Sequence, residues 1–253
     1  MIKYNMKLRL SSKMMVLILS TCLLIFGVAI GYISFNAKKN ALLDAKSLTD
    51  SYAREFAKST ESDLNSDMDM ARAMAISFSS YKKFPFKKYP QYYQSVLENL
   101  IHANQNYISV WLIWELSTID STWKKPYGRG RYTYYKGNGT ILYKEEILNT
   151  EGDNIEGAYY KMKVAKKEAV IDPYLFSYTG STTDQILETS LCVPILNNNE
   201  FKGLAGIDLP LDRYKEIIGK IMPFENSFAY LIANDGTLVA HPNHKLVSVK
   251  ITG

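Results

Sequence analysis

Cysteine and histidine are both scarce in this 253-residue sequence, which limits how its fold can be held together. The two cysteines are Cys22, inside an apolar run, and Cys192, within a predicted strand, so a membrane boundary is expected to keep them apart. The three histidines, His102, His241 and His244, have no cysteine or acidic neighbours at the spacing of a tetrahedral metal site. We therefore predict a fold that needs neither disulfides nor metal.

Motifs of enzymatic chemistry are also missing from the sequence. There is no nucleophile elbow, phosphate-binding loop or dinucleotide fingerprint. Gly128-Arg129-Gly130 lacks the preceding strand and following helix that a glycine-rich dinucleotide-binding motif requires. The scattered acidic residues offer no recognisable general acid and base pair. We predict no catalytic residues, no cofactor and no enzymatic activity.

Positive charge is concentrated at the N-terminus. The formal net charge is +5, and Lys3, Lys7, Arg9 and Lys13 supply most of it, which leaves about +1 for the rest of the chain. A nucleic-acid-binding protein would need a much stronger basic field over its folded part. The sequence therefore excludes nucleic acid as a partner.

One long apolar run follows this basic tail. Residues 14–35 contain no charge over 22 positions, and a helix of that length spans a hydrocarbon core of roughly 30 Å. A cleaved signal peptide is the alternative, but its apolar region is usually only about 7 to 15 residues and ends in a small-x-small site. The run is longer and no convincing site follows, so a transmembrane anchor is favoured.

The basic residues before the span indicate its orientation. Short basic tails stay in the cytoplasm, so residues 1–13 are predicted to be a cytoplasmic tail of an inner (plasma) membrane protein. Lys38 and Lys39 weaken this charge asymmetry, although they can reach the far interface by snorkelling. Residues from 36 onward are then periplasmic or extracellular.

A long amphipathic helix is expected to continue from the membrane. Residues 40–80 contain no proline or glycine, and a helix of about 40 residues is about 60 Å long, which suits dimerisation or signal transmission. Pro85 should end it, and a second helix is predicted over 90–104. The apolar positions recur at helical spacing: Leu42, Ala45, Leu48, Tyr52, Phe56, Leu64, Met68, Ala71, Ala75 and Phe78.

The rest of the chain alternates with period two between turn residues, which is typical of half-buried strands. The predicted fold class is therefore α+β, with an antiparallel sheet. Asparagine and glycine turns join the strands because both residues tolerate positive φ. Strands are expected at 107–114, 131–136, 140–143, 187–196, 200–208, 227–233 and 237–241, with a short helix at 212–221.

Four sequence pieces, in order, resemble the double Cache sensing domain of bacterial chemoreceptors (methyl-accepting chemotaxis proteins) and sensor kinases. They are Tyr159-Tyr160, Asp172-Pro173-Tyr174, Thr189 to Ile195 and Phe201 to Asp208. The resemblance covers about 36–247 and implies two PAS-like modules along a long helix. It places the membrane-distal module at 81–211, after the long helix at 36–80. It also implies a linker helix and a truncated membrane-proximal module at 212–253, so that the chain looks like a fragment.

The resemblance also indicates a ligand site, with two departures. Amino-acid-binding members of the family carry an arginine where this chain has Gly157 and an acid where it has Phe176, so standard amino-acid recognition is not expected. Asp208 does match a family acid and can accept bonds from a ligand cation. The alternative is that Asp208 caps the helix near Asp212 or makes a loop bond.

Aromatic residues are the other candidates for the ligand site. Flat rings with hydroxyl groups suit a small polar or cationic ligand, although ordinary core packing explains each ring equally well. Arg129 and Arg131 are candidates to replace the missing anion clamp, or else are solvated surface residues. The predicted ligand-binding residues are Trp111, Tyr135, Tyr159, Tyr160, Tyr174 and Asp208.

Together these features predict the sensing region of a membrane signal-transduction receptor of the chemoreceptor type. A small extracellular solute is expected to bind the distal module, and the long helix is expected to form a homodimer. The alternative is a membrane-anchored interaction module that senses nothing and pairs with a receptor partner. An extracytoplasmic enzyme is the third alternative.

Overall fold

The computed structural model describes residues 9–83 and 89–251, which fall into two compact units, 1–56 and 57–253. The prolyl break predicted at Pro85 and the residues Lys3 and Lys7 of the basic tail lie outside the described residues. Helix α1, Leu10–Ser79, runs for 70 residues without interruption, which confirms that the amphipathic helix continues from the apolar run.

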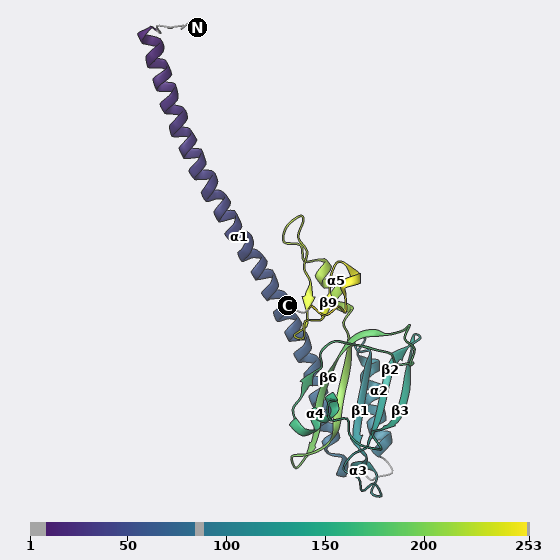
Figure 1. Ribbon diagram of the computed structural model, residues 1–253. Coiled ribbons are helices and arrows are strands. Elements are labelled where there is room, and N and C mark those ends of the chain that lie inside the picture. Colours follow the sequence, from purple (N-terminus) through teal and green to yellow (C-terminus); the bar gives the residue numbers. More distant parts are fainter. Residues whose placement is uncertain (1–8, 84–88, 252–253) are drawn as a thin grey trace. The chain divides into compact units, whose positions relative to one another are not determined.

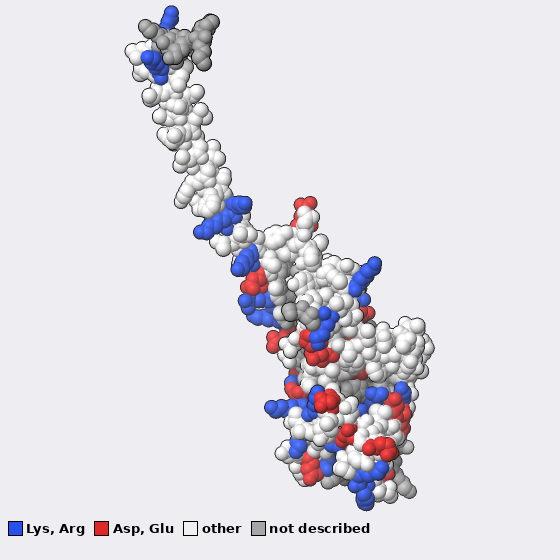
Figure 2. All heavy atoms as spheres, viewed as in Figure 1, with Lys and Arg blue, Asp and Glu red and all other residues white. Residues whose placement is uncertain are grey.

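The first unit consists of the N-terminal part of α1. Among the described residues, this helix is the one that is long and apolar enough to cross a membrane. Figure 2 shows an uncharged length of helix bounded by basic side chains at both ends. Large apolar side chains along 14–35 are exposed within the unit, as a helix surrounded by lipid requires.

The second unit is built on a seven-stranded antiparallel sheet (Figure 1). Its strand order is β3-β2-β1-β7-β6-β4, with β5 also paired to β6. The bounds are β1 Ser109–Glu115, β2 Arg129–Gly137, β3 Thr140–Leu148, β4 Ala169–Val170, β5 Tyr174–Phe176, β6 Ile186–Asn197 and β7 Glu200–Pro210.

Two hairpins of this sheet turn where the sequence predicted. Asn138 has φ of 53° and Gly139 has φ of 76° between β2 and β3, while Asn198 and Asn199 have φ of 51° and 61° between β6 and β7. Left-handed backbone at both central residues matches the right-handed twist of the flanking strands. The hairpin predictions are therefore confirmed.

One face of the sheet packs against helices. The last turns of α1 and helix α2, Tyr89–Ala103, bury their apolar side chains against alternate residues of β1, so that Val110, Leu112 and Trp114 are fully buried. These three side chains share the predicted face of the strand. Trp111 and Ile113 point to the other face, which is covered in part by α4, Ala158–Ala165, and carries the candidate site.

Short elements complete the chain: the 3₁₀ turns η1 (Tyr81–Lys83) and η3 (His244–Leu246), the helices α3 (Leu116–Ile119) and α5 (Arg213–Gly219), and the strands β8 (Leu231–Ile232) and β9 (Leu238–Ala240). Strand β8 is much shorter than the strand predicted at 227–233. Phe228 and Tyr230 are exposed, and Ser227 is held in a turn by hydrogen bonds with Phe224, so residues 227–230 lie outside the strand, while β8 pairs with β9 in a separate two-stranded antiparallel sheet. The division into distal and proximal modules stays a prediction.

Candidate functional site

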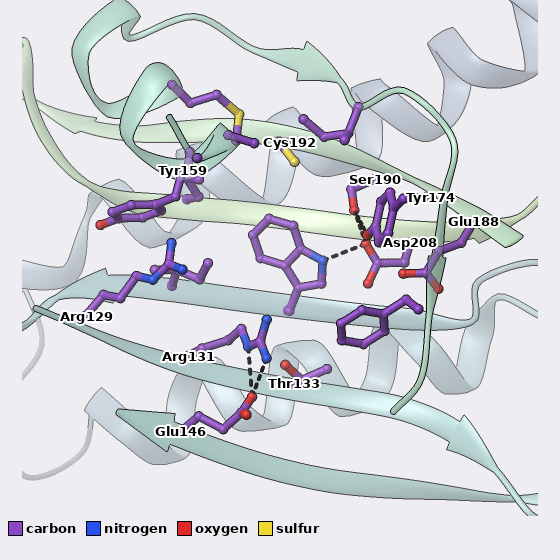
Figure 3. A pocket seen from close by; sticks show the side chains of 18 of the residues that line it. Arg129, Arg131, Thr133, Glu146, Tyr159, Tyr174, Glu188, Ser190, Cys192 and Asp208 are labelled. Atoms are coloured by element: carbon purple, nitrogen blue, oxygen red, sulfur yellow. Dashed lines mark hydrogen bonds and ion pairs between the residues drawn. The ribbon is translucent and has the colours of Figure 1, made fainter. Parts of the chain in front are cut away.

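A cavity of about 430 Å³ lies on the sheet face that α1 and α2 leave free (Figure 3). Its floor comes from β1, β2, β6 and β7, its wall on one side from β3, and its cover from α4 and β5. The lining combines apolar and aromatic side chains with converging polar and charged groups, and convergent polar groups of this kind fix the orientation of a ligand in a small-molecule pocket.

Trp111 forms the floor of the cavity because its strand neighbour is a glycine. Trp111 on β1 lies beside Gly206 on β7, and a Cβ atom at position 206 would overlap with the indole ring. The absence of a side chain therefore lets the ring lie across β7. In that position the indole Nε1 donates a hydrogen bond of 2.9 Å to Oδ1 of Asp208.

Asp208 is a buried carboxylate, 5% exposed, that accepts hydrogen bonds from four side chains. Trp111 and Ser190 donate to Oδ1 at 2.9 and 2.6 Å, and Tyr178 donates to Oδ2 at 3.0 Å. The hydroxyl of Ser109 also donates to Oδ2. These bonds rule out the alternative that Asp208 caps the next helix, and they place the residue in the cavity wall.

Glu188 is a second acid in the cavity wall, and the sequence analysis missed it. Its side chain is fully buried (0% exposed), Oε2 lies 2.9 Å from the same Tyr178 hydroxyl, and Oε1 has no hydrogen-bond partner among the described residues. Burial and then the charge of Asp208 raise its pKa to about 8. The signal in the sequence was an acid placed inside an otherwise apolar strand, ILETSLCVPI.

Basic side chains line the opposite end of the cavity. Arg131 on β2 donates from Nε and Nη2 to Oε2 of Glu146, its cross-strand neighbour on β3, at 2.9 and 2.5 Å. Lys144 also pairs with Glu146, at 3.0 Å. Arg129 has no such carboxylate among the described residues, and its Nε is buried without a hydrogen-bond partner. Its guanidinium instead lies 4.0 Å from the ring centre of Tyr159.

Helix α4 is fastened over the cavity by a buried ionic cluster. Lys163 donates to Glu115 on β1 and to Asp153, both at 2.9 Å, and the hydroxyl of Tyr159 donates to Glu115. Burial would lower the pKa of Lys163, but its bonds to the two carboxylates outweigh burial and raise it. The cluster holds the cover in place because removing one partner would leave a buried charge uncompensated.

Four of the six predicted ligand-binding residues line the cavity: Trp111, Tyr159, Tyr174 and Asp208. Tyr135 is not among the described lining residues; its ring stacks on that of Tyr178, with 5.0 Å between ring centres. Tyr160 follows Tyr159 on α4, and successive helical residues point in different directions, so it is not among the described lining residues. Tyr178 and Ser190 are further lining residues that the sequence analysis missed. The binding role of all these residues stays a prediction.

Comparison with known proteins gives a partial match in sequence. No protein-family model matches the chain. The methyl-accepting chemotaxis protein PscA of Pseudomonas syringae pv. tomato (strain ATCC BAA-871 / DC3000) is 29% identical over 118 residues, which are 46% of this chain and 18% of PscA. The chain therefore spans less than a fifth of the length of this relative.

Solved structures give a broader match in fold. The extracellular domain of mmHK1S-Z2, assigned as a histidine kinase, is 21% identical with a TM-score of 0.62, covering 78% of this chain and 72% of that one. The ligand-binding domain of Mlp24 with asparagine is 19% identical with a TM-score of 0.53, covering 82% and 76%. At these identities the likeness concerns the fold, and the α+β fold predicted from the sequence is confirmed.

Proposed function

We propose, from the dCache-type fold that this chain shares with extracellular ligand-binding domains of chemoreceptors and histidine kinases, that it is the extracytoplasmic sensing region of a membrane-anchored chemoreceptor. One observation carries the proposal: the cavity on the free face of the sheet, with two buried carboxylates at one end. A small polar or cationic solute is the ligand that such a wall would bind.

The similar proteins support the same function. PscA is a methyl-accepting chemotaxis protein, and Mlp24 has a ligand-binding domain that holds asparagine. We infer that the chain is not an enzyme, since the proteins it resembles are named as receptors or their sensing domains. Two departures, Gly157 and Phe176, argue that its ligand is held differently from an ordinary α-amino acid.

A ligand screen tests the proposal. The full chain in lipid nanodiscs is heated with a library of small amines, amino acids and their derivatives. A ligand at about 100 times its Kd stabilises the folded state by about 2.7 kcal/mol, which corresponds to a Tm rise of roughly 5 to 10 °C for a domain of this size. We expect at least one such compound.

Two variants of α4 make the screen specific to the cavity. Ala158 lines the cavity, whereas Val164 on the same helix is exposed and is not among the lining residues. Ala158→Trp should fill the opening and remove the Tm shift, and Val164→Trp should leave it unchanged. If no compound stabilises the chain, or if both variants behave alike, the sensing function is contradicted.

We also propose that the N-terminus is cytoplasmic and that α1 forms a homodimer. Leu48 is 42% exposed in the first unit and lies on the apolar stripe of the helix. In a chain carrying Cys22→Ala and Leu48→Cys, the new thiol should react with a membrane-impermeant maleimide added to intact cells. Under mild oxidation it should also form a disulfide-linked dimer. Native Cys192 is buried and should not react.

The outcome separates the competing functions. Labelling only after the cells are permeabilised would overturn the orientation, and a monomer after oxidation would overturn the dimer. A crosslink to a different protein, unaffected by any ligand, would favour the interaction module over the sensor.

A further inference from the structure

Two buried acids and one tyrosine hydroxyl are in contact at one end of the cavity. The Tyr178 oxygen is 2.9 Å from Oε2 of Glu188 and 3.0 Å from Oδ2 of Asp208. All three side chains are buried. In the described part of the chain, neither acid forms an ion pair with a basic side chain. No positive charge therefore compensates this end of the cavity if both acids are ionised.

The hydrogens at this contact allow only one of the two acids to be ionised. A phenol has a single hydrogen, so Tyr178 can donate to one acid and must accept from the other. Asp208 already accepts from the indole N–H of Trp111 and from two serine hydroxyls, so it is the acceptor. A proton on Glu188 completes the chain of bonds: Glu188 donates to Tyr178, and Tyr178 donates to Asp208.

The titratable groups around this contact bring no positive charge to it. They are Asp208 on β7, Tyr174 on β5, Tyr178 after β5 and Cys192 on β6, with Tyr135 on β2 stacked on Tyr178. Burial and then the charge of Asp208 raise the pKa of Tyr174, Tyr178 and Cys192, so these three groups stay neutral up to pH 9. Figure 3 shows Arg129 and Arg131 away from Asp208 and Glu188, beside Tyr159 and Glu146.

Glu188 is therefore the group whose charge changes near neutral pH. Burial and then the charge of Asp208 raise its pKa from 4.5 to about 8. Between these two values the folded chain binds a proton that the unfolded chain has released, so the stability of the fold decreases as the pH rises through this window. Above about pH 8 a second negative charge appears in a buried site that already holds Asp208.

Tyr178 attaches part of the cavity cover to these acids. It is the buried residue of the segment 177–185, whose residues 179–185 are exposed and which bonds within itself through Asp184. The Tyr178 ring also contacts that of Phe176 on β5, with 4.9 Å between ring centres. Strand β5 pairs with β6 over three residue pairs. The bonds of one phenol thus contribute much of the attachment of a short covering strand.

We propose that Glu188, Tyr178 and Asp208 form a proton-binding site through which external pH acts on the sensing region, as an input separate from any small-molecule ligand. With the proton bound, the chain of bonds is complete and β5 stays closed over the cavity. When the O–H bond of Glu188 breaks and the proton passes to water, two buried carboxylates repel each other. Tyr178 can then donate to only one of them, and β5 opens with the segment 177–185.

Infrared spectroscopy detects the proton directly. Difference spectra between pH 6 and pH 9 are recorded on the full chain in dodecyl maltoside, a detergent without carbonyl groups. The C=O band of a neutral carboxylic acid should disappear with a midpoint of about pH 8. Glu188→Gln should remove this band. Asp208→Asn should move the midpoint to lower pH, because the charge that opposes ionisation is gone.

Hydrogen exchange measures the opening of the cover. After correction for the intrinsic pH dependence of exchange, the opening equilibrium of the β5 amides, Tyr174–Phe176, should increase about tenfold or more from pH 6 to pH 9. Glu188→Gln should abolish the increase, since its amide donates to Tyr178 at every pH. Glu151→Gln is the matched control, because Glu151 is exposed, and it should behave like the native chain.

Each result supports or overturns the proposal. No band of a neutral acid at pH 6, or the same band in Glu188→Gln, would overturn the proton site. Exchange at β5 that does not change with pH, or that changes equally in Glu188→Gln, would overturn its effect on the cover. If Glu188→Gln does not fold, an unmoved midpoint in Asp208→Asn contradicts the site. Failure of the ligand screen would leave this proposal standing, and failure of these tests would leave ligand sensing standing.

Discussion

Replacing Asp208 with asparagine is expected to lower the free energy of unfolding by about 2 to 4 kcal/mol. Four donors converge on the two carboxylate oxygens of this buried side chain. An amide keeps one oxygen and turns an NH₂ group towards the other pair of donors, so buried donors lose their acceptor. The indole N–H of Trp111 is affected most, because it cannot rotate away as a hydroxyl can.

Urea unfolding of the full chain in detergent micelles, followed by tryptophan fluorescence, measures this loss. Asp172→Asn is the control, because Asp172 is exposed and should change the stability by less than about 0.5 kcal/mol. Removing the charge of Asp208 should also lower the pKa of Glu188, since that charge is one cause of its rise. An Asp208→Asn chain as stable as the control would show that the carboxylate is not needed to organise the wall.

Replacing Gly206 with alanine is expected to have an effect of similar size, for a steric reason. The added methyl group would overlap with the indole of Trp111, which is rigid and cannot yield at its tip as a lysine could. The ring must leave the floor of the cavity and lose its bond to Asp208. We expect a loss of about 2 to 4 kcal/mol together with loss of ligand binding.

A smaller ring tests this explanation directly. In the double variant Gly206→Ala with Trp111→Phe, the clash is relieved, so the combined loss of stability should be smaller than the sum of the two single losses. Gly219→Ala is the control because a Cβ at Gly219 meets nothing within 4 Å. Strict additivity of the two single changes would contradict the proposed contact.

Local features of this fold could be predicted from the sequence, because they depend on neighbouring residues. The alternation of side chains along β1 correctly placed Trp111 on one face of the sheet and Leu112 and Trp114 on the other. The asparagine residues correctly located the turns of both long hairpins. The long helix followed from the absence of proline and glycine. Each of these inferences used a pattern within one segment, where spacing and backbone preference decide the outcome.

The parts of the site that depend on register could not be predicted. Glu188 reaches Asp208 through the pairing of β6 with β7 and through Tyr178 on a separate segment, and nothing in any one segment reveals this. The same is true of the cross-strand ion pair between Arg131 and Glu146. This pair neutralises the charge of Arg131, so Arg131 is less available to bind an anion. Strand pairings set these contacts, and a shift of one residue would turn each side chain to the other face.

Strand β1 connects the cavity with the helical layer, because its consecutive residues point to opposite faces of the sheet. Trp111 lines the cavity, whereas Leu112, the next residue, is buried against the last turns of α1 and helix α2 on the opposite face. One planar peptide unit joins the two residues, so a displacement of the β1 backbone at Trp111 also moves the backbone of Leu112. A ligand that shifts the β1 backbone at Trp111 would therefore also act on the helical layer, because Leu112 packs there on the opposite face of the same strand.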